Sequence, residues 1–160
     1  MQIIGDFQTS VHKALKEIDP NYDKYDALVV CGTHRKGWDI PMILETIKEA
    51  RENGTPTLLI CWGHQLGAIE YARNVLGIKD ATSEEFGKGT IIVHKLPQLK
   101  VGLHDGETYW NNYEVDKDIL KLWKKDDNFV TCQFHPEYQS SKERPHPLLF
   151  NFIDYARNQM

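Results

Sequence analysis

Three residues at two places in the chain have the types that acyl transfer requires. Cys61 ends the apolar run 58–60 and is followed by Gly63, where a helix is predicted to begin. A thiol at such a strand-to-helix turn lies against the positive N-terminal end of the helix, which favours the reactive thiolate. Farther along the chain, His135 and Glu137 offer a general base and a carboxylate to orient it. A nucleophile and such a pair together indicate acyl transfer or amide hydrolysis.

The spacing within these motifs supports that chemistry. In an extended segment, side chains two residues apart point to the same side. The carboxylate of Glu137 would then bind one imidazole nitrogen of His135 while the other nitrogen faces the thiol. The backbone N–H of Trp62, at the start of the helix, and a second donor from the loop at Gly32 and Thr33 are predicted to form an oxyanion hole.

Each of the three residues also has a simpler interpretation. A buried cysteine often acts as a small hydrophobic residue, a histidine can bond a carbonyl in the core, and a glutamate can be a solvated loop acid. The pairs Cys61/His64 and Cys132/His135 share Cys-x-x-His spacing, which offers four ligands for structural zinc. We expect no metal site, because the first pair spans the turn and the second points to opposite faces of a strand. We also expect no cofactor.

The segments that must position these residues follow an α/β pattern. Continuous apolar runs predict strands at 27–31 and 57–61, with a shorter one at 3–7. Apolar residues at helical spacing predict helices over 11–18, 40–50 and 66–76, and a last one from about residue 147. Such alternation is typical of an α/β fold with three layers, in which helices flank an open, mostly parallel sheet.

The second half of the chain reads differently, as short strand-like pieces at 90–94, 101–103, 108–113 and 129–134. In open α/β sheets, sites form at the carboxyl ends of the strands. The loop after Cys31, the turn at Cys61 and the loop after Phe134 all follow predicted strands. We therefore expect these three segments to meet.

Composition limits the classes of function. The 160 residues, 41% hydrophobic and 26% charged, predict one globular domain over residues 1–160. A net charge of −4 without a dense Lys/Arg block argues against nucleic acid and anionic membrane as partners. No signal peptide and no apolar stretch of membrane-spanning length is evident. Three widely spaced cysteines in apolar surroundings indicate reduced thiols, so we predict a cytoplasmic protein.

The motifs resemble those of the class I glutamine amidotransferases, and the closer similarity is to the glutaminase domain of CTP synthase. The similarity rests on the segments 61–66, 69–81, 83–86, 113–115, 133–140 and 146–150, of which 133–140 contains His135-Pro136-Glu137. It implies a flavodoxin-like fold and a reaction in which Cys61 attacks the side-chain amide of glutamine to form a glutamyl thioester. His135 would protonate the departing ammonia and activate the deacylating water, while Glu137 orients His135.

The resemblance also implies which residues bind the substrate, and where this chain departs from the family. Gln65 and Glu85 fall on positions that hold the substrate amino acid, and we place His34 and Tyr113 beside them. The family arginine that pairs with the substrate carboxylate falls on Asn112, so Arg35 or Lys36 is the predicted replacement cation. The second glycine of the family's oxyanion loop is Thr33 here, and the residue after the nucleophile is Trp62.

The predicted function is cysteine-dependent hydrolysis of glutamine to glutamate and ammonia. The resemblance implies a partner as well, a separate ATP-dependent synthetase subunit that accepts the ammonia. Two alternatives remain open because the departures lie on the substrate side. One is a hydrolase of the same fold that acts on another amide or a γ-glutamyl compound. The other is a non-catalytic binding module with a degenerate glutamine site.

Overall fold

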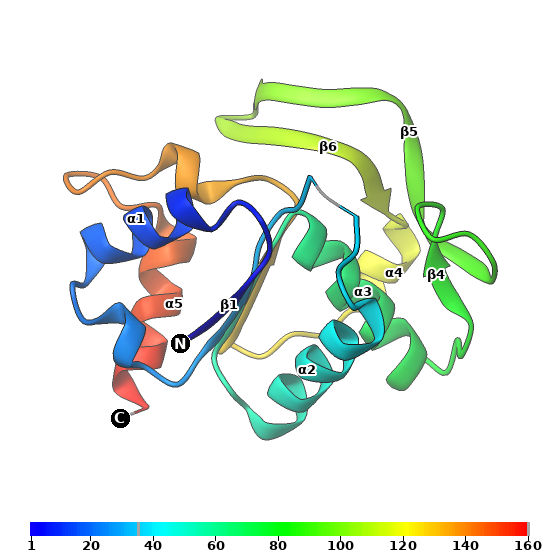
Figure 1. The fold of residues 1–160 in the computed structure, drawn as a ribbon, viewed down its shortest axis with the longest axis horizontal. Coiled ribbons are helices and arrows are strands. Elements are labelled where there is room, and N and C mark those ends of the chain that lie inside the picture. The colour runs from blue at the N-terminus through cyan, green and yellow to red at the C-terminus, as the bar shows by residue number, and fades with distance from the viewer. Residues whose placement is uncertain (35, 160) are drawn as a thin grey trace.

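A four-stranded parallel sheet forms the centre of the computed structural model, which describes residues 1–34 and 36–159 (Figure 1). Its strands lie in the order β1 (Gln2–Ile4), β2 (Leu28–Val30), β3 (Thr57–Ile60) and β7 (Phe129–Cys132). Strands β2 and β3 are buried on both faces, which explains their unbroken apolar sequences. The predicted strands at 3–7 and 129–134 are shorter in the structure than their apolar patterns indicated.

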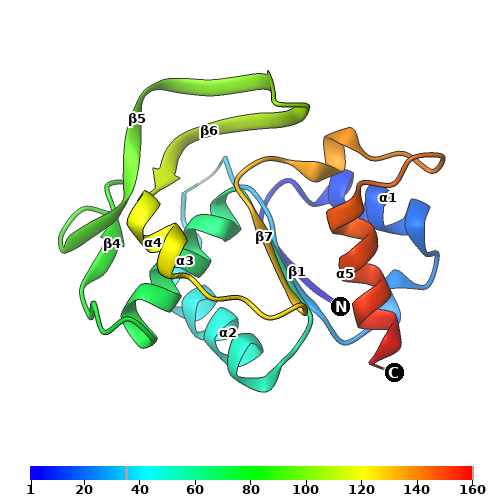
Figure 2. The same cartoon turned by 180° about the vertical axis from the view of Figure 1, so that it is seen from behind.

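Helices cover both faces of this sheet, as the sequence predicted. Helices α1 (Gln8–Ile18) and α5 (Pro147–Asn158) lie on one face, and α2 (Ile40–Asn53) and α3 (Trp62–Asn74) on the other (Figures 1 and 2). Because side chains alternate along a strand, Val29 packs with α1 and α5, while Leu28 and Val30 pack with α2 and α3. The three-layer α/β fold is therefore confirmed.

A largely buried ion pair joins α2 and α3, the two helices on the second face of the sheet. Arg51 of α2 donates to Glu70 of α3 through Nε at 2.7 Å and through Nη2 at 2.9 Å. Asn74 donates to the same carboxylate at 2.9 Å. A bidentate pair of this kind fixes both distance and direction, so it holds α3 in register with α2.

A second, three-stranded sheet contains β4 (Ala81–Ser83), β5 (Thr90–His104) and β6 (Glu107–Val115). Strands β5 and β6 form a long antiparallel hairpin that bends over the carboxyl end of the central sheet (Figure 1). Separate short strands at 90–94 and 101–103 were the wrong prediction, because both belong to β5. Pro97 and Gly102 interrupt the apolar pattern, and the pairing shifts register between Lys95 and Lys100 without ending.

The remaining elements are short. They are the 3₁₀ turns η1 (Tyr22–Lys24) and η2 (Pro136–Gln139) and the helix α4 (Lys117–Leu122), which the sequence pattern did not predict. Within residues 1–34 and 36–159, no helix has the length and apolar character that crossing a membrane requires.

Candidate active site

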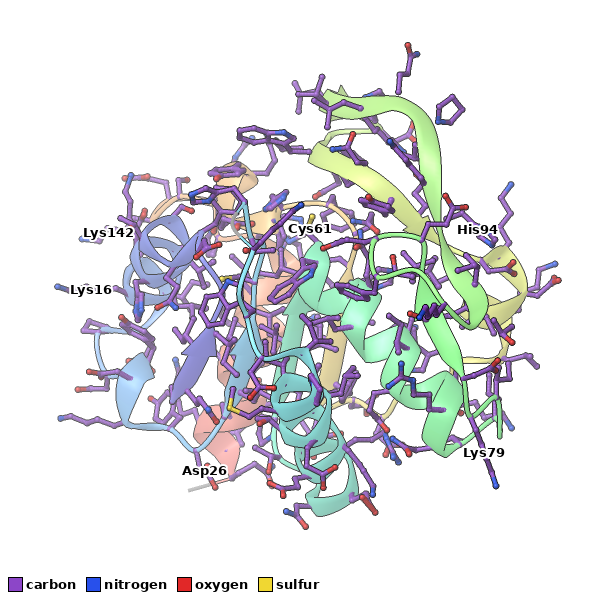
Figure 3. The ribbon with its side chains drawn as sticks, turned by 45° about the vertical axis from the view of Figure 1, so that its right-hand side comes forward. Lys16, Asp26, Cys61, Lys79, His94 and Lys142 are labelled. Carbon is purple, nitrogen blue, oxygen red and sulfur yellow. The ribbon has the colours of Figure 1, made fainter. Side chains whose placement is uncertain are left out.

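Cys61 occupies a strained turn between β3 and α3. Its φ of 55° and ψ of −105° lie where few side-chain-bearing residues are found, and its N–H donates to the carbonyl oxygen of Cys132 at 2.9 Å. A Cβ on Gly63 would lie 2.0 Å from the carbonyl oxygen of Val30, so only glycine lets α3 start this close to β2. Cys61 thus sits at the carboxyl end of the sheet, near the hairpin (Figure 3).

His135 follows β7 and lies beside this turn. Its backbone N–H donates to the carbonyl oxygen of Thr108 at 2.7 Å, and its side chain is 2% exposed. The Nδ1 atom lies 3.3 Å from Oε2 of Glu137. The expected extended segment was wrong, since Pro136 starts the 3₁₀ turn η2 and Glu137 reaches the imidazole from within that turn. The pairing of the two side chains is nevertheless present.

Cys61 and Glu137 together govern the protonation of the imidazole. Burial disfavours the charged ring, but hydrogen bonds and charge attraction from Cys61 and Glu137 outweigh it and raise the pKa of His135 to about 10. The structure therefore brings together the cysteine, histidine and glutamate that the sequence singled out. It favours a protonated imidazole between the sulfur and the carboxylate at neutral pH.

Two further groups contact the sulfur of Cys61. The carbonyl oxygen of Trp110 on β6 lies 3.6 Å from it, and Nε2 of Gln133 lies 3.6 Å away on another side. Neither contact was predicted. Gln133 stands two residues before His135 in a motif already singled out, and that adjacency was the available signal.

The predicted oxyanion loop lies against the same residues. A Cβ on Gly32 would be 2.8 Å from Cδ2 of Phe7 and 3.2 Å from Cε1 of His135, so the loop passes directly beside the imidazole. Thr33 is not in the left-handed region, so its β-branched side chain fits the backbone there. Trp62 begins α3 as predicted, and its ring packs on Trp38 with centroids 6.2 Å apart.

Asp6, which the sequence did not single out, anchors this loop. Its carboxylate accepts a hydrogen bond from the Thr33 hydroxyl, from the His34 N–H at 3.2 Å and from the indole N–H of Trp38 at 3.3 Å. The indole also donates to the Thr33 hydroxyl oxygen at 3.1 Å. Thr33, which replaces a family glycine, is therefore held in place by hydrogen bonds within this loop.

A pocket of about 360 Å³ opens beside Cys61, within the size range of small-molecule sites. Eight of the predicted site residues line it, namely Thr33, His34, Cys61, Trp62, Gln65, Glu85, Asn112 and Tyr113. The predicted residues Gly32, His135 and Glu137 lie behind this lining. Residues that the prediction missed or left open also line it: Phe7, Lys36, Leu99, Trp110 and Asn111.

The polar part of the pocket carries both signs of charge. Burial raises the pKa of Glu85, and the charge of Lys36 opposes that shift. Asn112 is exposed and has no charge, so it does not replace the family arginine. Arg35, the other predicted replacement cation, lies outside the described residues.

The amide group of Gln65, a predicted substrate-binding residue, is already hydrogen-bonded to other protein groups. Its Nε2 donates to the carbonyl oxygen of Tyr113 at 3.1 Å and to Oε1 of Gln133 at 3.3 Å. Both amide hydrogens are thus used inside the protein, although the side chain still borders the pocket.

Of the four residues in the zinc alternative, His64 does not join the other three in the structure. His64 turns away from the pocket, with Nδ1 2.6 Å from the Thr131 hydroxyl and its ring against Trp123. Burial lowers the pKa of His64 to about 3, so it is neutral. Over the described part of the chain, no three or more His, Cys, Asp or Glu side chains form a group that could hold a metal ion.

Comparison with known proteins indicates the family to which this chain belongs. The family model described as "Glutamine amidotransferase class-I" matches residues 6–155. A CTP synthase from Methanoregula boonei is 29% identical in an alignment 181 residues long, which covers 83% of this chain and 34% of that protein. A CTP synthase from Encephalitozoon cuniculi is 32% identical over 170 residues, covering 72% and 31%. The chain thus spans about a third of the length of these curated relatives.

A solved structure shares the fold. The glutaminase domain of Trypanosoma brucei CTPS with bound acivicin superposes with a TM-score of 0.75 over 99% of this chain and 94% of that one, at 18% sequence identity. The motif resemblance and the fold are both confirmed, and the chain belongs to the class I glutamine amidotransferase family.

Proposed function

We propose that the chain hydrolyses the side-chain amide of glutamine to glutamate and ammonia. The observation that carries this proposal is the row formed by Cys61, His135 and Glu137, whose cysteine lines a pocket that also holds a carboxylate and a lysine. The family model and the CTP synthase relatives support the same reaction.

In this mechanism the Cys61 sulfur attacks the amide carbon and a carbon–sulfur bond forms. The carbon–nitrogen bond breaks as the imidazolium of His135 gives its proton to the leaving ammonia. Neutral His135 then takes a proton from water, whose oxygen attacks the thioester carbon and releases glutamate. Glu137 stabilises the charged ring and holds its orientation throughout. The N–H of Trp62 and the loop at Gly32 and Thr33 would stabilise the oxyanion.

The two charges in the pocket fit the two charges of an amino acid. Burial raises the pKa of Glu85 and the charge of Lys36 offsets only part of that shift, so a substrate ammonium beside this carboxylate would favour its ordinary ionisation. Lys36 is the Lys or Arg side chain that the described lining offers to the substrate carboxylate. Asn112, Tyr113, Gln65 and His34 would shape the space between these ends.

The ammonia would pass to an ATP-dependent synthetase partner. This part of the proposal rests on the relatives, which are CTP synthases about three times as long as the matched region. Ammonia release that rises when such a partner and its substrates are added would support it.

The direct test of hydrolysis is ammonia release from glutamine by the purified chain, compared with Cys61→Ala. Loss of the nucleophile should lower kcat by about 10⁴-fold or more, because the residues of a triad act as a unit. Mass spectrometry should detect a glutamyl adduct on Cys61 of the parent protein alone. Equal ammonia release by the parent and the variant would rule out the mechanism.

A second candidate is hydrolysis of a γ-glutamyl amide whose amine carries an apolar group. Phe7 lies 6.3 Å from His135 and 6.0 Å from Trp110 between ring centroids, so aromatic walls stand where the leaving amine must receive its proton. Comparing kcat/KM for glutamine and γ-glutamyl-p-nitroanilide separates the two. A large preference for glutamine eliminates this candidate.

A further inference from the structure

A chain of side-chain amides leads from a backbone carbonyl of the hairpin to the sulfur of Cys61. The carbonyl oxygen of Tyr113 accepts from Nε2 of Gln65 at 3.1 Å. The same nitrogen donates to Oε1 of Gln133 at 3.3 Å. The Nε2 of Gln133 then lies 3.6 Å from Sγ of Cys61, within reach for a donor to sulfur.

The direction of this chain follows from its first member. A backbone carbonyl oxygen can only accept, so the end of the Gln65 amide that faces Tyr113 must be the NH₂ group. Because that group also faces Gln133, the near end of the Gln133 amide must be its oxygen. The other end, which faces the sulfur, is therefore a donor. Asn111 donates to the same Tyr113 carbonyl at 3.0 Å, so two amides occupy it.

The sulfur needs such a donor when it is ionised. A neutral thiol can donate its hydrogen to the Trp110 carbonyl oxygen, 3.6 Å away, but a thiolate would face the negative end of that carbonyl. A donor from Gln133 offsets this repulsion. Since the amide has no net charge, it does so without competing with Glu137 for the imidazolium of His135.

We propose that Gln133 is a positioning residue that donates a hydrogen bond to the Cys61 thiolate, with its direction fixed by the Tyr113 carbonyl through Gln65. The inference rests on the proposed role of Cys61 as the nucleophile. It gives Gln65 a function in orienting Gln133 in addition to its place beside the substrate.

The test is the pH dependence of Cys61 alkylation by iodoacetamide, measured by mass spectrometry without glutamine. Gln133→Met keeps the length of the side chain and removes the donor, so its alkylation midpoint should rise by about one pH unit. Gln133→Glu places a carboxylate against the sulfur and should raise the midpoint further. Gln65→Met frees Gln133 to rotate, so it should cause a smaller shift in the same direction.

Coupling between the two glutamines distinguishes a relay from two separate effects. The double variant Gln65→Met/Gln133→Met should have the midpoint of Gln133→Met alone, because a relay without its last donor has nothing left to orient. If Gln133→Met folds poorly, Gln133→Asn can replace it. This variant keeps an amide but withdraws it from the sulfur, so it should raise the alkylation midpoint as predicted for Gln133→Met. Thermal unfolding of every variant controls for stability.

Superimposed alkylation profiles of folded wild type, Gln133→Asn and Gln133→Glu would overturn the inference, as would additive shifts in the double variant. Together with an assay of ammonia release, the alkylation profiles distinguish failure of this inference from failure of the proposed function. A shifted profile in a protein that releases no ammonia would support the relay and reject glutamine hydrolysis. An unshifted profile in an active enzyme would reject the relay alone.

Discussion

The reacting side and the substrate side of the pocket are built in different ways. Cys61, His135 and Glu137 are buried at the ends of parallel strands, and backbone hydrogen bonds to Cys132 and Thr108 hold two of them. Lys36, Glu85 and Asn112 are exposed and lie on loops and on the hairpin. The chemistry is thus fixed by the core, whereas the contacts to substrate depend on segments that can change with little cost to the fold.

Two of the sequence departures from the family fall where this contrast predicts, whereas Trp62 is a buried departure next to the nucleophile. Thr33 and Asn112 occupy substrate-side positions, and Thr33 is accommodated by Asp6 and Trp38. On the reacting side, Gly63 is retained, and the structure leaves no space for anything larger. A position where the packing leaves no space, such as Gly63, therefore tolerates fewer substitutions than an exposed position such as Asn112.

The strongest test of the rigid side is Gly63→Ala. The added methyl would meet the Val30 carbonyl oxygen at 2.0 Å, so α3 or β2 must move. We expect a loss of about 3 kcal/mol in unfolding free energy and no measurable glutaminase activity. Urea unfolding and ammonia release measure the two effects. A variant with wild-type stability and activity would show that the turn is not sterically fixed.

The substrate side should respond in KM and not in stability. Lys36→Met removes the proposed partner of the substrate carboxylate, so kcat/KM should fall by roughly 10- to 100-fold, mostly through KM. Lys13→Met, which changes an exposed lysine on α1, is the matched control and should have no effect. If Arg35→Met causes the loss instead, Arg35 is the cation and the assignment to Lys36 is wrong.

A smaller effect, on the pH dependence of stability, would show how well water is excluded from the start of α3, the helix that follows Cys61. His64 is buried in the first turn of α3 and its pKa is lowered to about 3, whereas an unfolded histidine has a pKa near 6.5. The unfolded state therefore binds more protons between these values, and the contribution of His64 is full above pH 6.5 and lost as the pH falls toward 3.

Wild type should accordingly lose about 2 kcal/mol more than His64→Gln when urea unfolding is compared at pH 7 and pH 4.5. His12→Gln, at a partly buried position on α1, is a useful control. Equal losses in wild type and His64→Gln would mean that water reaches His64 in the folded protein.

How much the sequence could predict follows the same division. The apolar runs and Gly63 predicted the sheet, the turn and the place of Cys61, because each is a local signal. The pairing of His135 with Glu137 was predicted, but through an extended segment where Pro136 starts a 3₁₀ turn. The continuous hairpin was missed, since Pro97 and Gly102 break the strand pattern locally while cross-strand pairing continues.

The site residues that were not predicted were missed for the same physical reason. Asp6 and Gln133 act through partners that are distant in the chain, such as Trp38 and Cys61. An isolated aspartate or glutamine has no periodicity or spacing that reveals such partners. Only the folded backbone brings them into hydrogen-bonding distance.

The hairpin has a mechanical consequence for the site. Strand β6 contributes the Trp110 carbonyl near the sulfur, the Tyr113 carbonyl that orients Gln65, and the Thr108 carbonyl that accepts from the His135 backbone. Val101 and Leu103, on the paired strand near the turn, are 59% and 68% exposed, so the outer part of the hairpin is not packed against the rest of the described protein. Any force that bends this two-stranded arm displaces all three carbonyls together and is transmitted to the sulfur and the imidazole in a single movement.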